Sequence, residues 1–395
     1  MLEGRRIALV SRSYFPDDPR LARQAAALTG AGATVEVVCL RRPNAGERAR
    51  EEIDGVVVHR LGGTRLRGSR VRYIIEYGTF FLDAAFTLAS EHRRSRFALV
   101  QVANPPDALV GCGLPERLTG ARLMLDIHDL SPELYASKFG AGTYPVGARL
   151  LELVERAATR LSSHVLVAGE PFRERLIERG LAAIRVTSIP NGPDERLFEP
   201  HLRSSADSGQ LVYHGSLFDR YDLALALNAL PGIRTRRPDA RLEVWGEGPE
   251  LEPLRRRAEE AGLGTSVTFH RPAPLREIPS LVANAGCGLS TLRSDCFTEL
   301  AFPTKVAEYA QLGVPVAASR TAALTRVFPE DALAYYAPGD ADGLARAVLS
   351  VLEDPARAAK QAERARTAVE RLLWSRHAGK YLAVVEAVLA RPHRQ

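Results

Sequence analysis

One short stretch of the chain combines a cation, a carboxylate and a helix start at a spacing that suits phosphate binding. Pro303 and Thr304 predict that a helix begins here, with Lys305 in its first turn. A helix start attracts anions through its free N–H groups and its dipole, so a lysine there is unfavourable unless an anion lies nearby. Glu308 falls one turn later on the same face and could accept hydrogen bonds from ribose hydroxyls. Spacing alone leaves two interpretations open, a site for a phosphorylated ligand and a surface Lys–Glu pair on an ordinary helix.

Other phosphate and metal motifs are absent from the sequence. No GxGxxG follows the first predicted strand, which weakens a dehydrogenase hypothesis, and the lack of GxxxxGK[ST] excludes P-loop kinases. No His, Cys, Asp or Glu residues have metal-ligand spacing, so we expect neither a metal site nor a bound cofactor. The four cysteines lack CxxC spacing and predict reduced thiols in a cytosolic protein.

Composition and charge are typical of a globular protein with room for two domains. The 395 residues exceed one ordinary core, and 46% of them are hydrophobic and 25% charged. The net charge of +6 suits polyanions, anionic lipid or phosphorylated ligands without choosing among them. We expect no signal peptide and no membrane span, because the long apolar stretch from Ile74 to Ser90 is interrupted by Glu76 and Asp83.

Short apolar runs alternate with longer amphipathic runs along most of the chain. Such runs predict parallel strands covered on both faces by helices, as in a doubly wound α/β domain. A Pro-, Gly- and Ser-rich stretch from Pro190 to Gly209 predicts a linker, after which the alternation begins again. From Pro355 to Leu389 the pattern predicts helix only. Two Rossmann-like domains would place the ligand site in a cleft between them. The predicted strands are Ile7–Ser11, Thr34–Leu40, Val56–Leu61, Phe97–Val102, Leu123–Ile127, Val165–Ala168, Arg185–Ile189, Leu211–His214, Arg241–Trp245, Ser266–His270, Gly286–Ser290, Val314–Ala318 and Leu333–Tyr336.

The stretch around Lys305 resembles the donor-site signature of glycosyltransferase family 4. Glu308-Tyr309 followed by Leu312-Gly313-Val314-Pro315-Val316 is similar to the second half of that signature, and the form P-T-K-x-x-E-Y is similar to a subgroup of the family. The first glutamate of the signature is out of register, because Leu300 stands at its position and Glu299 is one residue away. The resemblance implies the GT-B fold, a retaining mechanism and a nucleotide-sugar donor. Whether Glu299, Asp295 or a backbone group contacts the sugar stays open.

Two further segments resemble the family's donor loops. The run from Tyr213 to Tyr221 is similar to its phosphate loop, in which Gly215 is retained and Ser216 replaces a basic residue. Arg220 lies one residue before the family's lysine and would bind a diphosphate with two hydrogen bonds; a solvated helix-start arginine is the alternative. Gly246-Glu247-Gly248-Pro249 is similar to the turn that approaches the nucleotide. The donor-binding residues that we expect are Gly215, Ser216, Gly246, Glu247, Glu299, Thr304 and Glu308, with Arg220 and Lys305 catalytic.

The first half of the chain resembles the acceptor domain of the same family. Asp17-Asp18-Pro19-Arg20 is similar to its opening, and Asn104 and His128-Asp129 follow predicted strands at their carboxyl ends, where α/β proteins bind ligands. The resemblance implies that His128 lies against the donor sugar as a catalytic residue; a lone histidine at a strand end is otherwise more often structural. Arg20, Asn104 and Asp129 are candidates for the acceptor side.

The resemblance covers nearly the whole chain and implies its domains. Residues 1–192 would bind the acceptor and would be completed by a returning helix at 374–395, and residues 193–373 would bind the donor. Asn191-Gly192 and Trp374-Ser375 are similar to the family's hinge and return.

The implied reaction is transfer of a hexose-type group from a UDP- or GDP-linked sugar to a hydroxyl acceptor, with retention and without a metal. A glycan, a lipid-linked sugar or a small molecule would be the acceptor, in polysaccharide, glycolipid or natural-product synthesis, and no nucleic acid is involved. A nucleotide-sugar 2-epimerase and a non-catalytic subunit stay open as alternatives.

A basic and aromatic stretch leaves a membrane contact open as well. Arg65, Arg67, Arg70 and Arg72 precede Tyr73, Ile74, Ile75, Tyr77, Phe80 and Phe81. An exposed loop leading into a core-packed helix is one interpretation, and a peripheral contact at the inner face of the membrane is the other. We therefore expect a cytoplasmic protein, with or without that contact, and the sequence does not indicate its oligomeric state.

Overall fold

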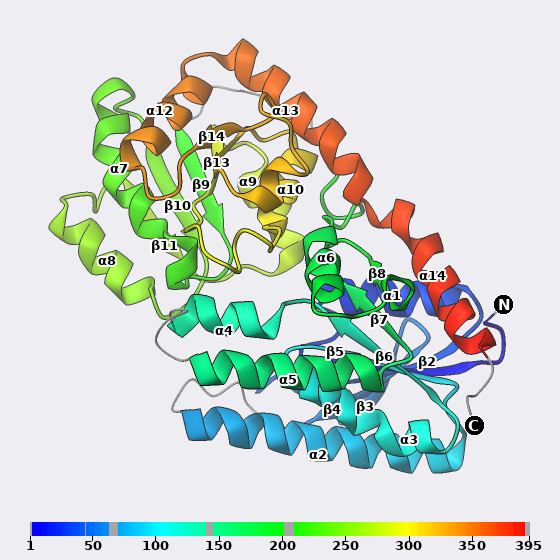
Figure 1. The fold of residues 1–395 in the computed structure, drawn as a ribbon. Coiled ribbons are helices and arrows are strands. Elements are labelled where there is room, and N and C mark those ends of the chain that lie inside the picture. Colours follow the sequence, from blue (N-terminus) through cyan, green and yellow to red (C-terminus); the bar gives the residue numbers. More distant parts are fainter. Residues whose placement is uncertain (1, 44, 63–69, 140–144, 201–208, 392–395) are drawn as a thin grey trace. The chain divides into compact units, whose positions relative to one another are not determined.

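The computed structural model describes residues 2–43, 45–62, 70–139, 145–200 and 209–391, and the chain divides into two compact units (Figure 1). Unit 1 comprises Met1–Pro190 and Ser375–Gln395, and unit 2 comprises Asn191–Trp374. Each unit is an α/β domain around its own largely parallel sheet. The predicted fold class, two Rossmann-like doubly wound domains, is confirmed.

The sheet of unit 1 has eight strands in the order β3-β4-β2-β1-β5-β6-β7-β8. Every pairing is parallel except that of β3 with β4. The strand order reverses between β1 and β5, so the carboxyl ends near this switch point are where such a sheet binds ligands. The strands are β1 (Arg6–Val10), β2 (Thr34–Leu40), β3 (Arg50–Ile53), β4 (Val56–Leu61), β5 (Leu99–Ala103), β6 (Arg122–Ile127), β7 (His164–Val167) and β8 (Val186–Ser188). The helices are α1 (Pro19–Gly30), α2 (Arg70–Arg94), α3 (Leu114–Leu118), α4 (Ser131–Phe139), α5 (Pro145–Leu161), α6 (Glu170–Glu178) and α14 (Trp374–Ala390).

Unit 2 has a six-stranded parallel sheet in the order β11-β10-β9-β12-β13-β14. One apolar cluster fills the face covered by α7 and α12, and a second fills the opposite face, which α10 and α13 cover. The strands are β9 (Gln210–His214), β10 (Arg241–Trp245), β11 (Val267–His270), β12 (Cys287–Ser290), β13 (Val316–Ser319) and β14 (Ala334–Tyr336). The helices are α7 (Leu223–Arg236), α8 (Leu251–Glu260), α9 (Ile278–Val282), α10 (Thr304–Gln311), α11 (Ala322–Thr325), α12 (Ala341–Leu352) and α13 (Pro355–Val369).

Most predicted strands lie within two residues of the observed ones, and the differences have physical causes. Strand β3 was not predicted because its sequence, REEI, is charged; it pairs at the sheet edge, where Glu51 accepts a hydrogen bond from Arg60 at 2.7 Å. The prediction of helix only from Pro355 to Leu389 holds except at one junction. A 3-10 turn at Glu370–Leu372 and an extended Leu373 separate α13 from α14.

Apolar helices in the described ranges are all too short or too polar to cross a bilayer. The stretch that was predicted either to pack in the core or to contact a membrane is partly buried and partly exposed, as far as the structure describes it. Phe80 is buried, Tyr77 stacks against Arg12 with 4.1 Å from guanidinium to ring centre, and Ile75 is exposed. Arg65 and Arg67 lie outside the described residues.

Candidate functional site

In unit 2, the loops after β9 and β10 lock together through glycines. The Gly215 N–H donates to the carbonyl of Trp245, the last residue of β10, and the Leu217 N–H donates to that of Glu247 in the following turn, both at 2.9 Å. A Cβ on Gly246 would lie 2.0 Å from the Gly215 carbonyl oxygen, and one on Gly248 would lie 2.1 Å from that of Leu217. Both turn positions therefore require glycine. Gly215 itself has φ +121°, which also favours glycine. These contacts fix the backbone of residues 215–217, called the glycine loop below, at the carboxyl end of the sheet.

Helix α10 begins at Thr304 without a capping side chain. Pro303 is its N-cap residue and has no side-chain acceptor to offer, and the first turn contains no acidic residue. The helix start therefore keeps its partial positive charge uncompensated. Lys305, in the first turn, adds a full positive charge at the same place.

Lys305 is a buried cation held by aromatic rings. Its side chain is only 8% exposed, and its Nζ lies 3.6 Å from the centre of the Tyr213 ring and 4.7 Å from that of Tyr221. A Cβ on Gly215 would lie 3.3 Å from the same Nζ, so the ammonium group reaches the glycine loop. Lys305 forms no ion pair or hydrogen bond through its ammonium group with any residue that the structure describes. Burial lowers the pKa of Lys305 to about 7.

Arg220 places a second cation beside the Tyr221 ring, which Lys305 also contacts. Its guanidinium lies 5.2 Å from the centre of the Tyr221 ring and 5.6 Å from that of Phe297. Its Nε is buried without a hydrogen-bond partner, and the guanidinium has no carboxylate partner among the described parts of the chain. Two cations that contact one Tyr221 ring repel each other unless an anion compensates them. The arrangement therefore favours binding of a doubly charged group such as a diphosphate.

The Glu308 carboxylate lies beside the imidazole of His214. Its Oε2 lies 3.2 Å from Nε2 of His214, the last residue of β9. Burial, aided by the positive charge of Lys305, lowers the pKa of His214 to about 3, so the imidazole is neutral. The His214 backbone N–H also donates a hydrogen bond to the Tyr309 hydroxyl oxygen at 3.2 Å. The carboxylate of Glu308 is thus placed at the end of β9, beside the glycine loop.

The two acidic residues before α10 both build the loop in which they lie. Glu299 accepts hydrogen bonds from the Ala322 N–H at 2.7 Å and the Ser294 hydroxyl at 2.5 Å. Asp295 accepts from the N–H groups of Phe297 and Thr298, each at 2.8 Å. Ser216 and Glu247 are exposed on the two loops, and the Ser216 carbonyl accepts from the Tyr213 hydroxyl at 2.8 Å.

In unit 1, a buried ion pair lies behind His128. Asp126, at the end of β6, is fully buried and accepts from the Arg20 guanidinium, with a closest distance of 2.6 Å, and from Gln24 at 2.7 Å. His128 Nε2 lies 3.3 Å from the same carboxylate. Burial would raise the pKa of Asp126, but Arg20 and His128 outweigh it and hold this pKa far below its usual range. The carboxylate in turn raises the pKa of His128 despite its burial.

The Asn104 side chain holds the backbone of His128 and Asp129 in place through hydrogen bonds. Its side-chain oxygen accepts from the His128 N–H at 2.6 Å, and its amide donates to Asp107 at 2.6 Å and to the Asp129 carbonyl at 2.7 Å. Asn104 is buried, whereas His128 and Asp129 are half-exposed. Arg20, buried in its ion pair, is therefore a positioning residue in this structure, as is Asn104.

The structure thus gathers the predicted residues into two groups, one in each unit. Unit 2 brings together Gly215, Arg220, Lys305 and Glu308, and unit 1 brings together Arg20, Asn104, His128 and Asp129. Sequence reasoning missed Asp126 and His214 as partners of the site. Both are the last polar residues of buried strands, His214 one position before Gly215 and Asp126 two positions before His128, and that placement was the available signal.

The fold and these two groups define a class of protein. Two such doubly wound units are the GT-B architecture. Residues 18–192 match the model of the glycosyl transferase 4-like domain, and residues 195–368 match that of the glycosyl transferases group 1. With one such domain in each half, the chain belongs to the GT-B glycosyltransferases of the family 4 type.

Relatives and solved structures agree with this assignment. A GDP-mannose-dependent alpha-(1-6)-phosphatidylinositol monomannoside mannosyltransferase of Mycolicibacterium smegmatis is 27% identical over 235 residues, which are 55% of this chain and 60% of that protein. This chain thus matches less than two thirds of that relative's length. Sucrose-phosphate synthase of Thermosynechococcus elongatus has a TM-score of 0.76 at 20% identity, covering 98% of this chain and 99% of that one. Anabaena HepE in complex with UDP-glucose has a TM-score of 0.73 at 17% identity, covering 97% and 99%.

Proposed function

We propose that the protein transfers a hexose-type sugar from a nucleotide diphosphate to a hydroxyl acceptor. The proposal rests on two cations, Lys305 and Arg220, that form no ion pair with the described residues. Both lie against the Tyr221 ring, and Lys305 is in the first turn of α10, which begins without a capping side chain. The diphosphate of the donor would occupy this place, and Glu308 would accept from the ribose hydroxyls. The relatives support a UDP- or GDP-linked donor, because HepE was solved with UDP-glucose and the mycolicibacterial protein uses GDP-mannose.

The chemical difficulty of such a transfer is the negative charge that collects on the leaving diphosphate. Lys305, Arg220 and the N–H groups at the start of α10 would stabilise that charge as the glycosidic bond breaks. Since these groups supply positive charge, we propose that the reaction needs no metal ion. Retention of the anomeric configuration, which the family resemblance implies, requires no pair of carboxylates for a double displacement. For His128, which Asp126 orients, we propose the role at the donor sugar that the family resemblance implies.

The direct test is turnover by the purified full-length chain. UDP-, GDP- and dTDP-sugars are first screened for thermal stabilisation, because a bound donor raises the melting temperature. Stabilising donors are then incubated with glycan, lipid-linked and small-molecule acceptors, with and without EDTA. We expect transfer to an acceptor that persists in EDTA. Isomerised donor without an acceptor would favour a 2-epimerase instead, and donor binding without any turnover would favour a non-catalytic subunit.

The pKa of Lys305 makes donor binding depend on pH. In the free chain Lys305 loses its proton above about pH 7, whereas a bound diphosphate favours the ammonium form. Binding above pH 7 must therefore take up a proton, and we expect UDP or GDP affinity to fall by up to about tenfold per pH unit between pH 7 and 9. Calorimetric titrations at three pH values measure this slope. Lys305→Arg stays charged and should bind with a flat profile; an equal slope in both proteins would contradict the assignment.

Exposed apolar side chains on two helices of unit 1 support a peripheral membrane contact. Leu82 and Phe86 of α2 are 67% and 72% exposed, and Leu150 and Leu153 of α5 are 60% and 61% exposed. Such side chains would insert at the lipid interface, which suits a lipid-linked acceptor.

The membrane contact predicts a loss of vesicle binding when the α2 side chains become polar. We expect Leu82→Ser with Phe86→Ser to lower co-sedimentation with phosphatidylglycerol vesicles severalfold, because apolar area available to the lipid is removed. Ile184→Ser, at a position that is 80% exposed elsewhere in unit 1, is the matched control and should bind as the unmodified chain does. Equal binding by all three proteins would show that these two α2 side chains make no contact with the membrane.

A further inference from the structure

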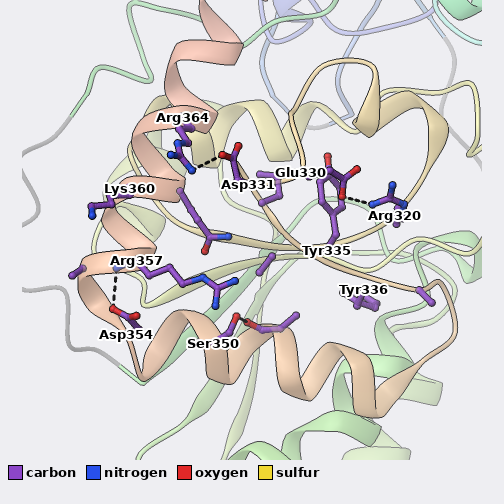
Figure 2. A pocket seen from close by; sticks show the side chains of 16 residues that line it. Arg320, Glu330, Asp331, Tyr335, Tyr336, Ser350, Asp354, Arg357, Lys360 and Arg364 are labelled. Carbon is purple, nitrogen blue, oxygen red and sulfur yellow. Dashed lines mark hydrogen bonds and ion pairs between the residues drawn. The ribbon is translucent and has the colours of Figure 1, made fainter.

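A cavity of about 740 Å³ lies in unit 2 against the edge strand β14, between α12 and α13 (Figure 2). It shares no lining residue with the group around Lys305. Its volume is in the range of small-molecule sites. The residues that carry the argument are Arg320, Glu330, Asp331, Tyr335, Arg357 and Gln361.

Two of the arginines in the cavity wall are neutralised, and Arg357 is not. Arg364 pairs with Asp331 at 2.5 Å, and Arg320 pairs with Glu330 (Figure 2). The third lining carboxylate, Asp354, accepts the backbone N–H of Arg357 at 2.9 Å as the cap of α13. The Arg357 guanidinium has no carboxylate partner among the described residues, and in Figure 2 it extends from α13 into the space near Ser350.

A buried acceptor lies in the same wall. Gln361, one turn after Arg357 on α13, is 6% exposed, and its Oε1 has no hydrogen-bond donor within the described structure. Buried carbonyl oxygens of this kind are normally satisfied by an N–H or O–H group. The half-buried ring of Tyr335, on β14, forms part of the same cavity and stacks with Arg320 at 5.7 Å.

We infer that this cavity binds a small sugar phosphate, at a site separate from the one for the donor. Arg357 would hold the phosphate, a sugar hydroxyl would donate to Gln361 Oε1, and the Tyr335 ring would pack against the sugar. An apolar ligand would leave both Arg357 and Gln361 without partners, and inorganic phosphate would fill only a small part of the volume. The inference does not depend on the proposed function, because the cavity and the group around Lys305 have no residue in common.

The test is calorimetric titration of the full chain with glucose 1-phosphate, glucose 6-phosphate and mannose 6-phosphate, beside glucose and inorganic phosphate. We expect at least one sugar phosphate to bind at one equivalent and at least tenfold more tightly than either fragment. Arg357→Met and Gln361→Leu should each weaken this binding at least tenfold. Arg366→Met removes a charge from the same helix outside the cavity, and Lys305→Ala removes the donor-site cation; both should bind as the unmodified chain does.

Several results would overturn the inference. They are binding by none of the sugar phosphates, equal affinity for inorganic phosphate, unchanged binding by Arg357→Met, and loss of binding in Lys305→Ala, which would place the ligand at the donor site. Thermal melting of each variant checks its fold. Arg357 is exposed, so its substitution is decisive even if Gln361→Leu fails to fold.

Discussion

Lys305→Ala should lower sugar transfer about 10²–10³-fold, the effect of removing one group that stabilises charge in a transition state. Its ammonium group is buried and reaches the glycine loop, and it forms no ion pair with a carboxylate in the described structure, although the charge of Glu308 favours its protonated form. Its contribution therefore belongs to the bound diphosphate and not to the fold. Initial rates at saturating donor measure the effect, and Lys305→Arg should recover part of the rate because the positive charge is retained.

The same variant has a distinctive effect on stability. Burial of an ammonium group that forms no ion pair is unfavourable, and it outweighs the charge of Glu308, as the lowered pKa of Lys305 indicates. Removal of the group should therefore not lower the free energy of unfolding of the free chain. We expect the melting temperature of Lys305→Ala without ligand to stay constant or rise, while stabilisation by donor is lost. A slow variant that also melts at lower temperature would point to a damaged fold, and an unchanged rate would remove Lys305 from the mechanism.

Asp126→Ala should destabilise unit 1 by about 3–5 kcal/mol, the usual effect of removing one partner of a buried ion pair. The substitution leaves the Arg20 guanidinium buried at 4% exposure, without the carboxylate that it contacts at 2.6 Å. It also removes the group that orients His128. The melting transition of unit 1 should fall by roughly 10 °C, and turnover should fall with it.

A double-mutant cycle separates this ion pair from simple loss of packing. Arg20→Met with Asp126→Leu removes both charges, so the double variant should be markedly less unstable than the sum of the two single variants. Acid adds a second check. Because the folded-state pKa of Asp126 is depressed, its contribution is present above the unfolded pKa of about 4 and is lost as the pH falls below that value. Additive effects together with unchanged acid sensitivity would contradict the assignment.

Local rules predicted the parts of the site that lie within one segment. The start of α10 was predicted from Pro303 and the helical period, and the fold class from buried apolar strands, because both depend on neighbours in sequence. Helix α7 contains Pro231-Gly232, which by itself is a turn signal. Burial of Leu227, Leu230 and Ile233 against the sheet outweighs that signal.

The rest of the site depends on contacts between distant segments. The Tyr213 and Tyr221 rings that hold Lys305 lie more than 80 positions before it, and no periodicity relates them. Helix spacing alone placed Glu308 on the same face as Lys305 and left a Lys–Glu surface pair open as the alternative. In the structure the Glu308 carboxylate approaches His214, because β9 brings that imidazole to within 3.2 Å, and its charge also acts on Lys305. Asp126 was missed for the same reason, since its partner Arg20 lies 106 residues away.

The most direct measurement of the central claim compares nucleotides that differ only in the diphosphate. Calorimetry gives the affinities of UDP and uridine, and of GDP and guanosine, for the unmodified chain and for Lys305→Ala with Arg220→Ala. We expect at least one diphosphate to bind the unmodified chain about 100-fold or more tightly than its nucleoside, and this difference to fall below about tenfold in the double variant. A double variant that keeps the full difference would show that these two cations do not bind the donor diphosphate.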